Sequence, residues 1–238
     1  MKLHNLNRLA TLAVVPLLLL YSCGKTYHGE GERIEEQRKI EHFNKLVLNM
    51  NAVVTITDTP EFSCTIIAQQ NILEAIVTRL DGKTLVITSK GNLITDKPIE
   101  IVIGMNQLAA IEVNGSGEIY GRNTFKNSDF DFEVNGSGKL ELDLVAVNVS
   151  GAVTGSGLSK ISGSANSLNI EINGSGTIDA SKFSTIKAKT KLSGSGEADL
   201  MVSESLEASV SGSGKVNYRG NAEVDKNISG SGEVRKLD

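Results

Sequence analysis

The chain has 238 residues, of which 39% are hydrophobic and 22% charged, so it holds enough apolar residues to bury the core of one domain. Its formal net charge of −4 argues against nucleic-acid binding, which needs a basic face to neutralise phosphates. Two cysteines and three histidines are too few for a zinc site and leave little for a catalytic cluster, so no metal ligand or cofactor is predicted.

Residues 1–22 have the pattern of a secretory signal peptide. Two basic residues precede an apolar run over residues 12–20, which is too short to cross a bilayer as a helix. Leu20 stands three positions before Cys23, with the small residue Ser22 directly before the cysteine, and this pattern resembles the lipobox of bacterial lipoproteins. The resemblance implies that Cys23 is cut free as the first residue of the mature chain and carries a diacylglycerol. An ordinary signal peptide with an unrelated cysteine is the alternative.

The residues that follow the lipobox are predicted to form a polar tether. Gly24, rather than Asp, follows the cysteine, which by the same resemblance favours the outer membrane, on either the cell surface or the periplasmic face. Residues 23–39 are rich in Gly, Glu and Arg. We therefore expect a solvated link between the lipid and a folded domain.

Residues 40–112 are the N-terminal, β-rich half of the predicted domain. Alternation over residues 45–57 indicates strands, and residues 71–76 indicate one helical turn. Asp81-Gly82 is a strong turn pair and predicts a hairpin over residues 76–88. We expect this half to form either extra coils of the repeat that follows or a β cap over its open edge.

Residues 113–238 contain a repeat of about nineteen residues, marked by the tripeptide Gly-Ser-Gly. Successive copies are separated by 21, 19, 19, 20, 18 and 18 residues, a regularity that a flexible linker would not show. The seven copies begin at Gly115, Gly136, Gly155, Gly174, Gly194, Gly212 and Gly230.

The residues around each tripeptide repeat as well. An aliphatic residue stands two positions before the first glycine in every copy: Val113, Val134, Val153, Ile172, Leu192, Val210 and Ile228. Residues 130–134 and 168–172 alternate with a period of two, as a strand with one buried face does. So small a unit must stack on its neighbours to bury that face. We predict an all-β, single-domain parallel β-helix, a solenoid with coils of about nineteen residues, right-handed like other parallel crossovers.

The glycines are expected to form one corner of every coil. A recurring corner needs a positive φ or close stacking of the backbone, and glycine allows both without steric cost. The Asn, Thr or Ser before each tripeptide is expected to bond free N–H groups of the corner and to stack as a polar ladder. Residues 149–165 carry additional Gly and Ser, so a bulge or loop is expected to interrupt the stack there.

Seven such units behind a lipobox resemble the head GIN domain family, described as proposed auto-transporter adhesins of Bacteroidetes-type bacteria. Residues 43–46, 71–73 and 81–85 fit the N-terminal part of that family, so the resemblance covers about residues 40–235. It implies a parallel β-helix on an exported envelope protein. It implies no established ligand and no catalytic residues.

Two kinds of chemistry are not expected from the repeat. Calcium binding in every coil needs an acid after each turn, but this position is mixed: Glu118, Lys139, Leu158, Thr177, Glu197, Lys215 and Glu233. Cleavage of a polysaccharide needs, on one face, either a carboxylate with Arg or Lys or a pair of carboxylates. Asp129 with Asp131, or Glu133 with Glu171 on successive strands, could supply one, yet we expect a solvated outer face for all four.

The remaining candidate side chains are expected to be inert. Cys64 lies in a strand-like stretch and is predicted to be a small buried hydrophobic residue rather than a reactive thiol. His28 and His42 are expected on the surface.

Taken together, these patterns predict a non-enzymatic envelope lipoprotein, an adhesin or scaffold anchored in the membrane by a lipid on Cys23. Equivalent side chains at a fixed step suit a repetitive partner, such as a polysaccharide or a cell-surface protein, because weak contacts add as avidity. The alternatives are a periplasmic carbohydrate-active enzyme and a structural module that self-associates through its coil ends. The ligand-binding residues and the oligomeric state stay open.

Overall fold

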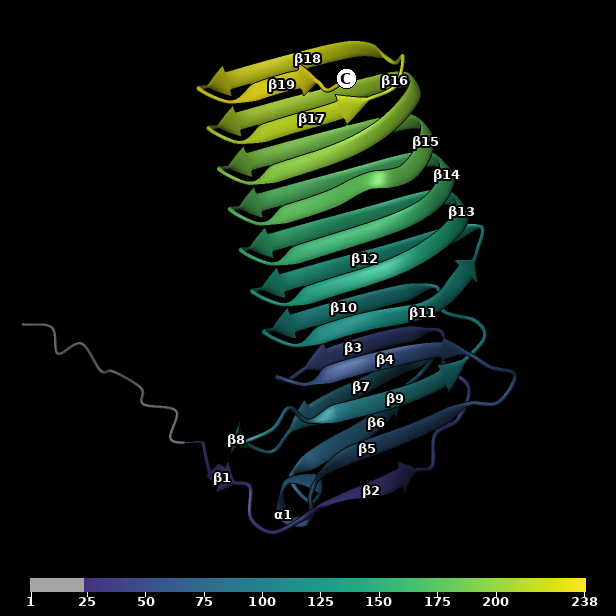
Figure 1. Ribbon diagram of the computed structural model, residues 1–238, viewed down its shortest axis with the longest axis vertical. Coiled ribbons are helices and arrows are strands. Elements are labelled where there is room, and N and C mark those ends of the chain that lie inside the picture. The colour runs from purple at the N-terminus through teal and green to yellow at the C-terminus, as the bar shows by residue number, and fades with distance from the viewer. Residues whose placement is uncertain (1–23) are drawn as a thin grey trace, which may run out of the picture.

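The computed structural model describes residues 24–238, which form an elongated stack of β-coils with the N-terminal strands at one end and the C-terminal strands at the other (Figure 1). This part contains nineteen strands, seventeen of them in one sheet, and a helix of four residues. None of its helical structure is long and apolar enough to cross a membrane. The predicted all-β solenoid is confirmed. The leader 1–22 and Cys23 lie outside the described residues.

The elements divide into those before the repeat and those within it. The first group is β1 (Thr26–His28), β2 (Arg33–Arg38), β3 (Lys45–Asn49), β4 (Val53–Asp58), β5 (Ser63–Gln69), α1 (Gln70–Leu73), β6 (Ile76–Asp81), β7 (Thr84–Ser89), β8 (Asn92–Ile94) and β9 (Glu100–Met105). The second group is β10 (Ala110–Gly115), β11 (Glu118–Lys126), β12 (Asp129–Gly136), β13 (Lys139–Gly155), β14 (Leu158–Gly174), β15 (Thr177–Gly194), β16 (Glu197–Gly212), β17 (Lys215–Arg219), β18 (Glu223–Gly230) and β19 (Glu233–Lys236).

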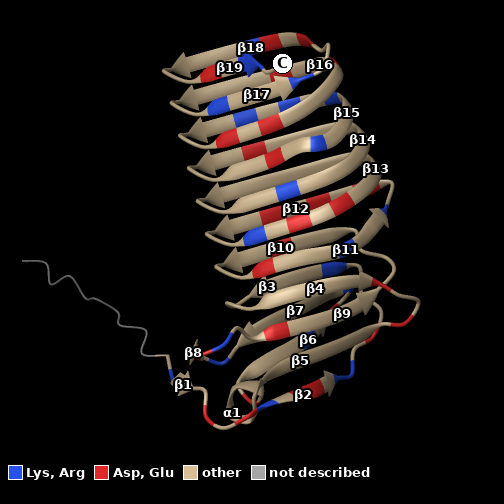
Figure 2. Ribbon diagram, viewed as in Figure 1, with Lys and Arg blue, Asp and Glu red and all other residues tan. Residues whose placement is uncertain are grey.

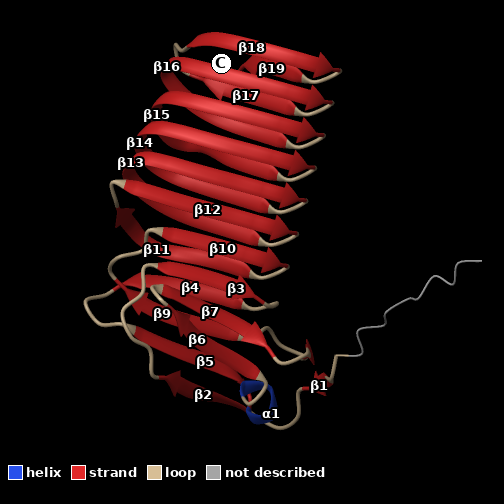
Figure 3. Cartoon of the chain, turned by 180° about the vertical axis from the view of Figure 1, so that it is seen from behind, coloured by secondary structure: helices blue, strands red, loops and turns tan. Residues whose placement is uncertain are grey.

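Each coil of the repeat has two legs on opposite sides of the stack, joined at one edge by a Gly-Ser-Gly corner. In β13 to β16 the second leg of one coil runs without a break into the first leg of the next, so a single long strand spans the other edge. With the C-terminal coil uppermost, front strands such as β11 run to the right and rear strands such as β12 run to the left (Figures 1 and 3). The coils therefore rise with the predicted right-handed sense.

Neighbouring coils of the repeat pair in parallel, with their corners aligned. The first glycine of each corner is paired with that of the next corner from Gly115 to Gly230. The aliphatic row two positions earlier points into the core, and its members from Val113 to Val210 are at most 2% exposed. Both features of the repeat that were predicted from the sequence are thus confirmed.

Backbone contacts between coils explain why glycine occupies the corners. The first glycine of each corner has a φ between +98° and +124°, where side chains other than hydrogen are disfavoured. A Cβ atom on Gly174 would also lie 2.5 Å from the carbonyl oxygen of Gly155 in the coil below. From Ser137 onward, the serine N–H of each corner donates to that same glycine carbonyl one coil below, at 2.8 to 2.9 Å. The Asn, Thr or Ser side chain before each tripeptide was expected to accept a hydrogen bond from this N–H group. The backbone of the coil below accepts it instead.

Asparagine stacking does occur at the N-terminal end of the repeat. The Asn135 amide donates to Asn114 at 3.0 Å, and Asn114 donates to Asn49 at 2.6 Å. This part of the expected polar ladder is confirmed.

No loop interrupts the stack over residues 149–165, where a bulge or loop was expected. β13 and β14 pair in parallel along nearly their whole length. The register shifts instead between β14 and β15, where the step from Lys160 to Ser162 faces the longer step from Asp179 to Lys182. One extra residue in β15 is accommodated as a bulge, so the stack remains continuous.

The N-terminal half contains extra coils and also a cap. β3 and β4 stack beneath β10 and β11, and β7 and β9 stack beneath β3 and β4, all in parallel. β5 and β6 then pair in antiparallel with β9 and β7, and β2 pairs with β5. The predicted hairpin at Asp81-Gly82 joins β6 to β7, and α1 is the predicted helical turn. The expectation of extra coils therefore holds for β3, β4, β7 and β9, and the expectation of a cap holds for β2, β5 and β6.

The structure corrects the prediction of a polar tether over residues 23–39. Residues 26–28 form β1, which pairs with β8, and residues 33–38 form β2, which pairs with β5. β2 lies at the end of the stack, none of its side chains is buried, and Ile34 is its single large apolar residue. An edge strand of this kind lacks the apolar alternation by which strands are predicted from sequence.

Candidate functional site

Cys64 and the two histidines do not form a reactive site. Cys64 lies on β5 and is 2% exposed, and burial raises the pKa of its thiol to about 11, against a smaller lowering effect of the charge on Arg38. It is the buried hydrophobic residue that was predicted. His28 is exposed on β1, and His42 is exposed with its ring 4.4 Å from that of Phe62.

The expected carboxylate pair of Glu133 and Glu171 is not formed on successive strands. Ala152 of β13 lies between the two residues in the same row. Lys191 and Asn173 donate to Glu171 at 3.0 and 3.1 Å, and these bonds lower the pKa of its carboxyl group. A general acid needs a raised pKa. Within residues 24–238, no group of three or more His, Cys, Asp or Glu side chains is placed to hold a metal ion.

The first legs of the coils present their outward side chains on one side of the stack, which we call the groove face. It is formed by β10, β12, the C-terminal halves of β13 to β16, and β18, and it lies toward the viewer in Figure 3. Because the strands pair in parallel, equivalent residues of successive coils stand side by side, about 4.8 Å apart. Residues three, five and seven positions before a corner glycine therefore form continuous rows along the stack.

Charges on the groove face are sorted by coil. β12 presents a row of carboxylates, the next two coils present mainly small or uncharged side chains, and β15 presents a row of lysines. In that order the residues are Asp129, Asp131 and Glu133; Asn148, Ser150 and Ala152; Ser167, Asn169 and Glu171; and Lys187, Lys189 and Lys191. Asp129 and Asp131, the other expected pair of carboxylates, are exposed members of the first row.

A shallow trough lies between the carboxylates of β12 and the lysines of β15. The two rows are three strand spacings apart, about 14 Å, and an open hollow of about 560 Å³ spans them and extends past β12 to Ala110 and Lys45. Both walls and the floor contribute to its lining: Asp131, Glu133, Ser150, Ala152, Asn169, Lys189 and Lys191. A second open hollow of about 760 Å³ continues from Asn169 and Lys189 across β16 and β18. The groove face is thus hollowed over several coils.

Ion pairs orient two of the lysines in the wall. Lys191 Nζ lies 3.0 Å from Glu171 Oε1 on the floor side, and Lys189 Nζ lies 2.7 Å from Glu207 Oε1 on the far side. All four side chains are more than 40% exposed, so the pairs add little to stability. Seen from the opposite face, charges of both signs are spread over the coils rather than gathered at one place (Figure 2).

The walls of the trough were not predicted from the sequence. The inward rows stand out in the repeat because their members are apolar in copy after copy, whereas the outward rows change from one copy to the next. The signal was present nevertheless, as three alternate carboxylates over residues 129–133 and three alternate lysines over residues 187–191. Following the outward positions of the aligned copies would have located both walls.

Several solved structures share this fold. A "putative adhesin" from Bacteroides fragilis has a TM-score of 0.84 and 21% identity, covering 89% of this chain and 100% of its own. A "putative lipid binding protein" from Parabacteroides distasonis has a TM-score of 0.74 and 21% identity, covering 90% and 100%. A "putative adhesin" from Parabacteroides merdae has a TM-score of 0.71 and 15% identity, covering 90% and 99%. At these identities the similarity shows the solenoid fold alone. No curated protein matches the chain.

A family model identifies the chain more closely. The model described as "Putative auto-transporter adhesin, head GIN domain" matches residues 42–222, from the residue before Phe43 to the loop that precedes β18. The match covers most of the chain, including the extra coils, the cap strands β5 and β6, and most of the repeat. It confirms the resemblance drawn from the corners and the N-terminal segments. The chain belongs to the head GIN domain family of adhesin-like proteins of the cell surface or envelope.

Proposed function

We propose that this protein is a lipid-anchored envelope protein that binds an extended polysaccharide along the trough of the groove face without cleaving it. Membership of an adhesin-like family supports a binding role at the cell surface or envelope, as do the names of two neighbours in structure. The lipobox around Cys23 supports a lipid anchor, and Gly24 after it favours the outer membrane.

The observation that carries the proposal is the lining of the trough. Apart from Glu171, its floor is made of short side chains, so a ligand chain running parallel to the strands can lie close to the sheet. Carboxylates on one wall accept hydrogen bonds, and lysines on the other wall donate them. A sugar hydroxyl both donates and accepts, so one polysaccharide chain satisfies both walls at once. Ser150 and Asn169 add donors and acceptors from the floor.

The same lining favours binding over cleavage. The hollow is open, and the carboxylates of β12 are exposed to solvent. Glu171, the carboxylate on the floor side, is held ionised by Lys191 and Asn173. A glycosidase needs one carboxylic acid that stays protonated beside its substrate. Glu171 does not provide such a group.

Filling the floor of the trough tests the proposal. Ala152→Trp places a large ring between the walls, and Thr177→Trp places the same ring on the outward side of the opposite leg as a matched control. The purified protein is applied to an array of purified bacterial polysaccharides. We expect the wild type and T177W to bind the same glycan, and A152W to bind it at least about tenfold more weakly, a change of ~1.4 kcal/mol.

Two results would contradict the proposal. Undiminished binding by A152W would show that the trough is not the site. Release of new reducing ends from the bound polysaccharide would show that the protein is an enzyme.

A further inference from the structure

The first residues after Cys23 are fixed to the cap rather than free. β1 pairs with β8 through three residues, from Thr26 with Asn92 to His28 with Ile94. The Asn92 N–H donates to the carbonyl of Lys25 at 3.0 Å, so the chain is already held one residue before β1. Only Gly24 separates this fixed point from Cys23.

Close packing holds β1 in this position. A Cβ atom on Gly91 would lie 2.0 Å from the carbonyl oxygen of Lys25, so the strand passes directly against a glycine. Tyr27 and Leu93 are paired across the two strands and pack against the core. Asn71 then donates to the carbonyl of His28 at 2.6 Å. The segment is fastened to the cap by its backbone, by its packing and by α1.

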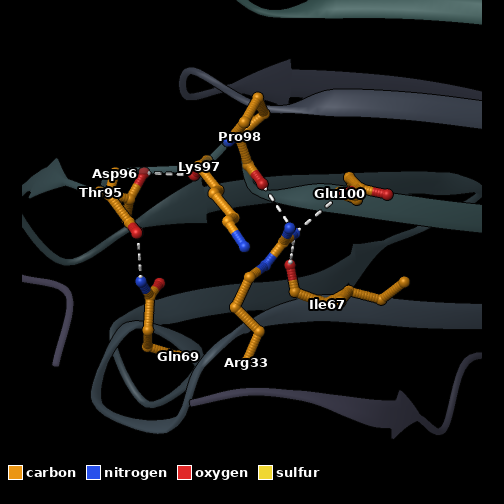
Figure 4. A network of polar contacts seen from close by, with 8 residues as sticks. All are labelled: Arg33, Ile67, Gln69, Thr95, Asp96, Lys97, Pro98 and Glu100. Carbon is orange, nitrogen blue, oxygen red and sulfur yellow. Dashed lines mark hydrogen bonds and ion pairs between the residues drawn. The ribbon is translucent and has the colours of Figure 1, made fainter. Parts of the chain in front are cut away.

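A polar network ties the segment that carries β8 to the strands of the cap. The Arg33 guanidinium donates to the carbonyl groups of Ile67 and Pro98, at 3.0 and 2.8 Å, and pairs with Glu100 at 2.9 Å. Gln69 donates to Asp96 at 2.8 Å. These residues come from β2, β5, β9 and the loop between β8 and β9 (Figure 4). The β1–β8 pair is thus linked to the body of the solenoid through ordered elements.

We propose that the β1–β8 end of the molecule faces a phospholipid bilayer, with the C-terminal coil pointing away from it. The inference rests on the proposed lipid anchor at Cys23. Two residues from Cys23 to Lys25 span at most about 7 Å, so the anchored chain keeps β1 next to the lipid headgroups. A free tether over residues 24–39 would have left the orientation open, but a link of two residues does not.

The side chains at this end suit a position beside headgroups. Ile94 is 47% exposed on the outward side of β8, next to exposed His28. Lys25 Nζ lies 4.6 Å from the centre of the Tyr27 ring, and aromatic and basic residues together are common at membrane interfaces. Glu30 lies two residues after His28, so this end is not uniformly basic, and the inference rests on the short link between Cys23 and Lys25.

The orientation determines what the rest of the molecule does. Seven corners at about 4.8 Å per coil place the last corner about 29 Å beyond the first, and still farther from the lipid. The strands that border the trough then run roughly along the membrane surface, several coils above it. A polysaccharide lying in the trough would approach from the side, without competition from the headgroups.

Single tryptophans test this orientation, because the chain has no Trp of its own. Ile94→Trp places the reporter at the β1–β8 end, and Ile228→Trp places it on β18, where Ile228 is also exposed, at 38%. The full chain is acylated in a bacterial host, purified and reconstituted into vesicles of phosphatidylethanolamine and phosphatidylglycerol. A lipid with a nitroxide on its headgroup serves as the quencher. We expect several-fold stronger quenching for I94W than for I228W.

The outcomes separate the orientation from the anchor. Equal quenching of the two reporters in vesicle-bound protein, or stronger quenching of I228W, would overturn the orientation. Flotation of a Cys23→Ser variant with the vesicles would instead contradict the lipid anchor and the orientation that rests on it, whereas glycan binding is tested separately by A152W. Loss of flotation in C23S together with selective quenching of I94W supports the anchor and the orientation.

Discussion

The two ends of the solenoid are finished in different ways. At the N-terminal end, antiparallel strands β2, β5 and β6 and helix α1 continue past the last parallel coil and cover it. At the C-terminal end, β18 and β19 pair with the coil below, and no described residue covers their other edge. Both ends face the same problem, since an open end exposes unpaired backbone groups and the apolar rows of the core.

The end coil solves this problem with its own side chains. Lys226 occupies the inward row that holds Ala208 in the coil below, and Lys236 occupies the row of Tyr218. Both lysines are exposed. Stacking a second molecule on this end would seal two ammonium groups in an apolar core, which is costly without partners. Inward charges on edge strands are a known protection against pairing of sheet edges.

This comparison shows that a repeat can end in two ways, by a change of topology or by a change of composition. The covered end has buried apolar residues and a close-packed interior. The C-terminal coil has the same topology as its neighbours, but its inward side chains are less buried. Ile228 is 38% exposed, whereas Val210, its equivalent in the coil below, is 2% exposed. The hypothesis of self-association through the coil ends gains no support from either arrangement.

Truncation of a core side chain should separate the ends most clearly. Ile66→Ala removes a side chain that is 0% exposed in the cap, and Ile228→Ala removes one that is 38% exposed in the end coil. We expect I66A to lower the free energy of unfolding by ~4 kcal/mol and I228A by less than ~1 kcal/mol, because only the first leaves a cavity. Urea unfolding followed by circular dichroism measures both. Equal losses would contradict the difference in burial.

Substitution of the corner glycines should show where the backbones of neighbouring coils approach each other most closely. Gly174→Ala combines a φ of +124° with a contact of 2.5 Å to the Gly155 carbonyl, whereas Gly115→Ala at the N-terminal end has a φ of +98° and no atom within 4 Å. We expect G174A to cost ~3 kcal/mol of stability and G115A ~1 kcal/mol, which reflects backbone conformation alone. Ser175→Ala is the matched control in the same corner and should stay within ~0.5 kcal/mol. Thermal unfolding of the three variants would show the order, and a G115A as damaging as G174A would refute it.

Removal of the two lysines should turn the C-terminal end into an interface. The double variant Lys226→Ile and Lys236→Leu restores an apolar surface on both legs of the end coil. We expect it to associate at least about tenfold more tightly than the wild type, equivalent to ~1.4 kcal/mol. Light scattering during size-exclusion chromatography, over a range of protein concentrations, measures this. Lys182→Ile, a lysine exposed elsewhere on the stack, is the control, and a double variant that remains as monomeric as K182I would contradict the role of the lysines.

Thiol labelling should reveal the smallest difference, the local opening of the two ends. Cys64 is buried in the cap and its thiol has a pKa of about 11, so at neutral pH it is almost fully protonated and unreactive. A Val234→Cys substitution places a thiol in the end coil, at a site that is 8% exposed. In a background with Cys64→Ala, V234C should label with a disulfide reagent at least about tenfold faster than Cys64 does in the wild type, since the end coil opens locally. Similar rates would mean that both ends are equally protected.

The sequence predicts the repeat well because the determinants of each coil are local. The corner glycines and the aliphatic residues two positions before them recur at nearly constant distance, and parallel stacking follows once they are aligned. The N-terminal half depends on contacts between distant residues. β10 stacks on β3 although 60 residues lie between them, and β2 becomes a strand only because β5 is available to it. Neither pairing leaves a periodic signal in the sequence.

The candidate site was predicted in its nature but not in its place. A repetitive polar face was expected, yet the carboxylates singled out were considered as catalytic pairs. In space, the short side chains of β13 lie beside them and the lysines of β15 lie three strands away, although these residues are some twenty and sixty positions away along the chain. Only the alignment of successive coils shows that the row of lysines lies on the same face as the row of carboxylates.

Amide hydrogen exchange at the corners tests most directly whether the coils are stacked in register, on which the groove face and its trough depend. The N–H groups of Ser175 and Ser195 donate to Gly155 and Gly174 of the coil below, while Ser116 has no Gly-Ser-Gly corner beneath it. We predict slow exchange for Ser175 and Ser195, comparable to the core strands, and fast exchange for Ser116. Exchange of all three at the rate of an unstructured Gly-Ser linker would contradict the stacked corners.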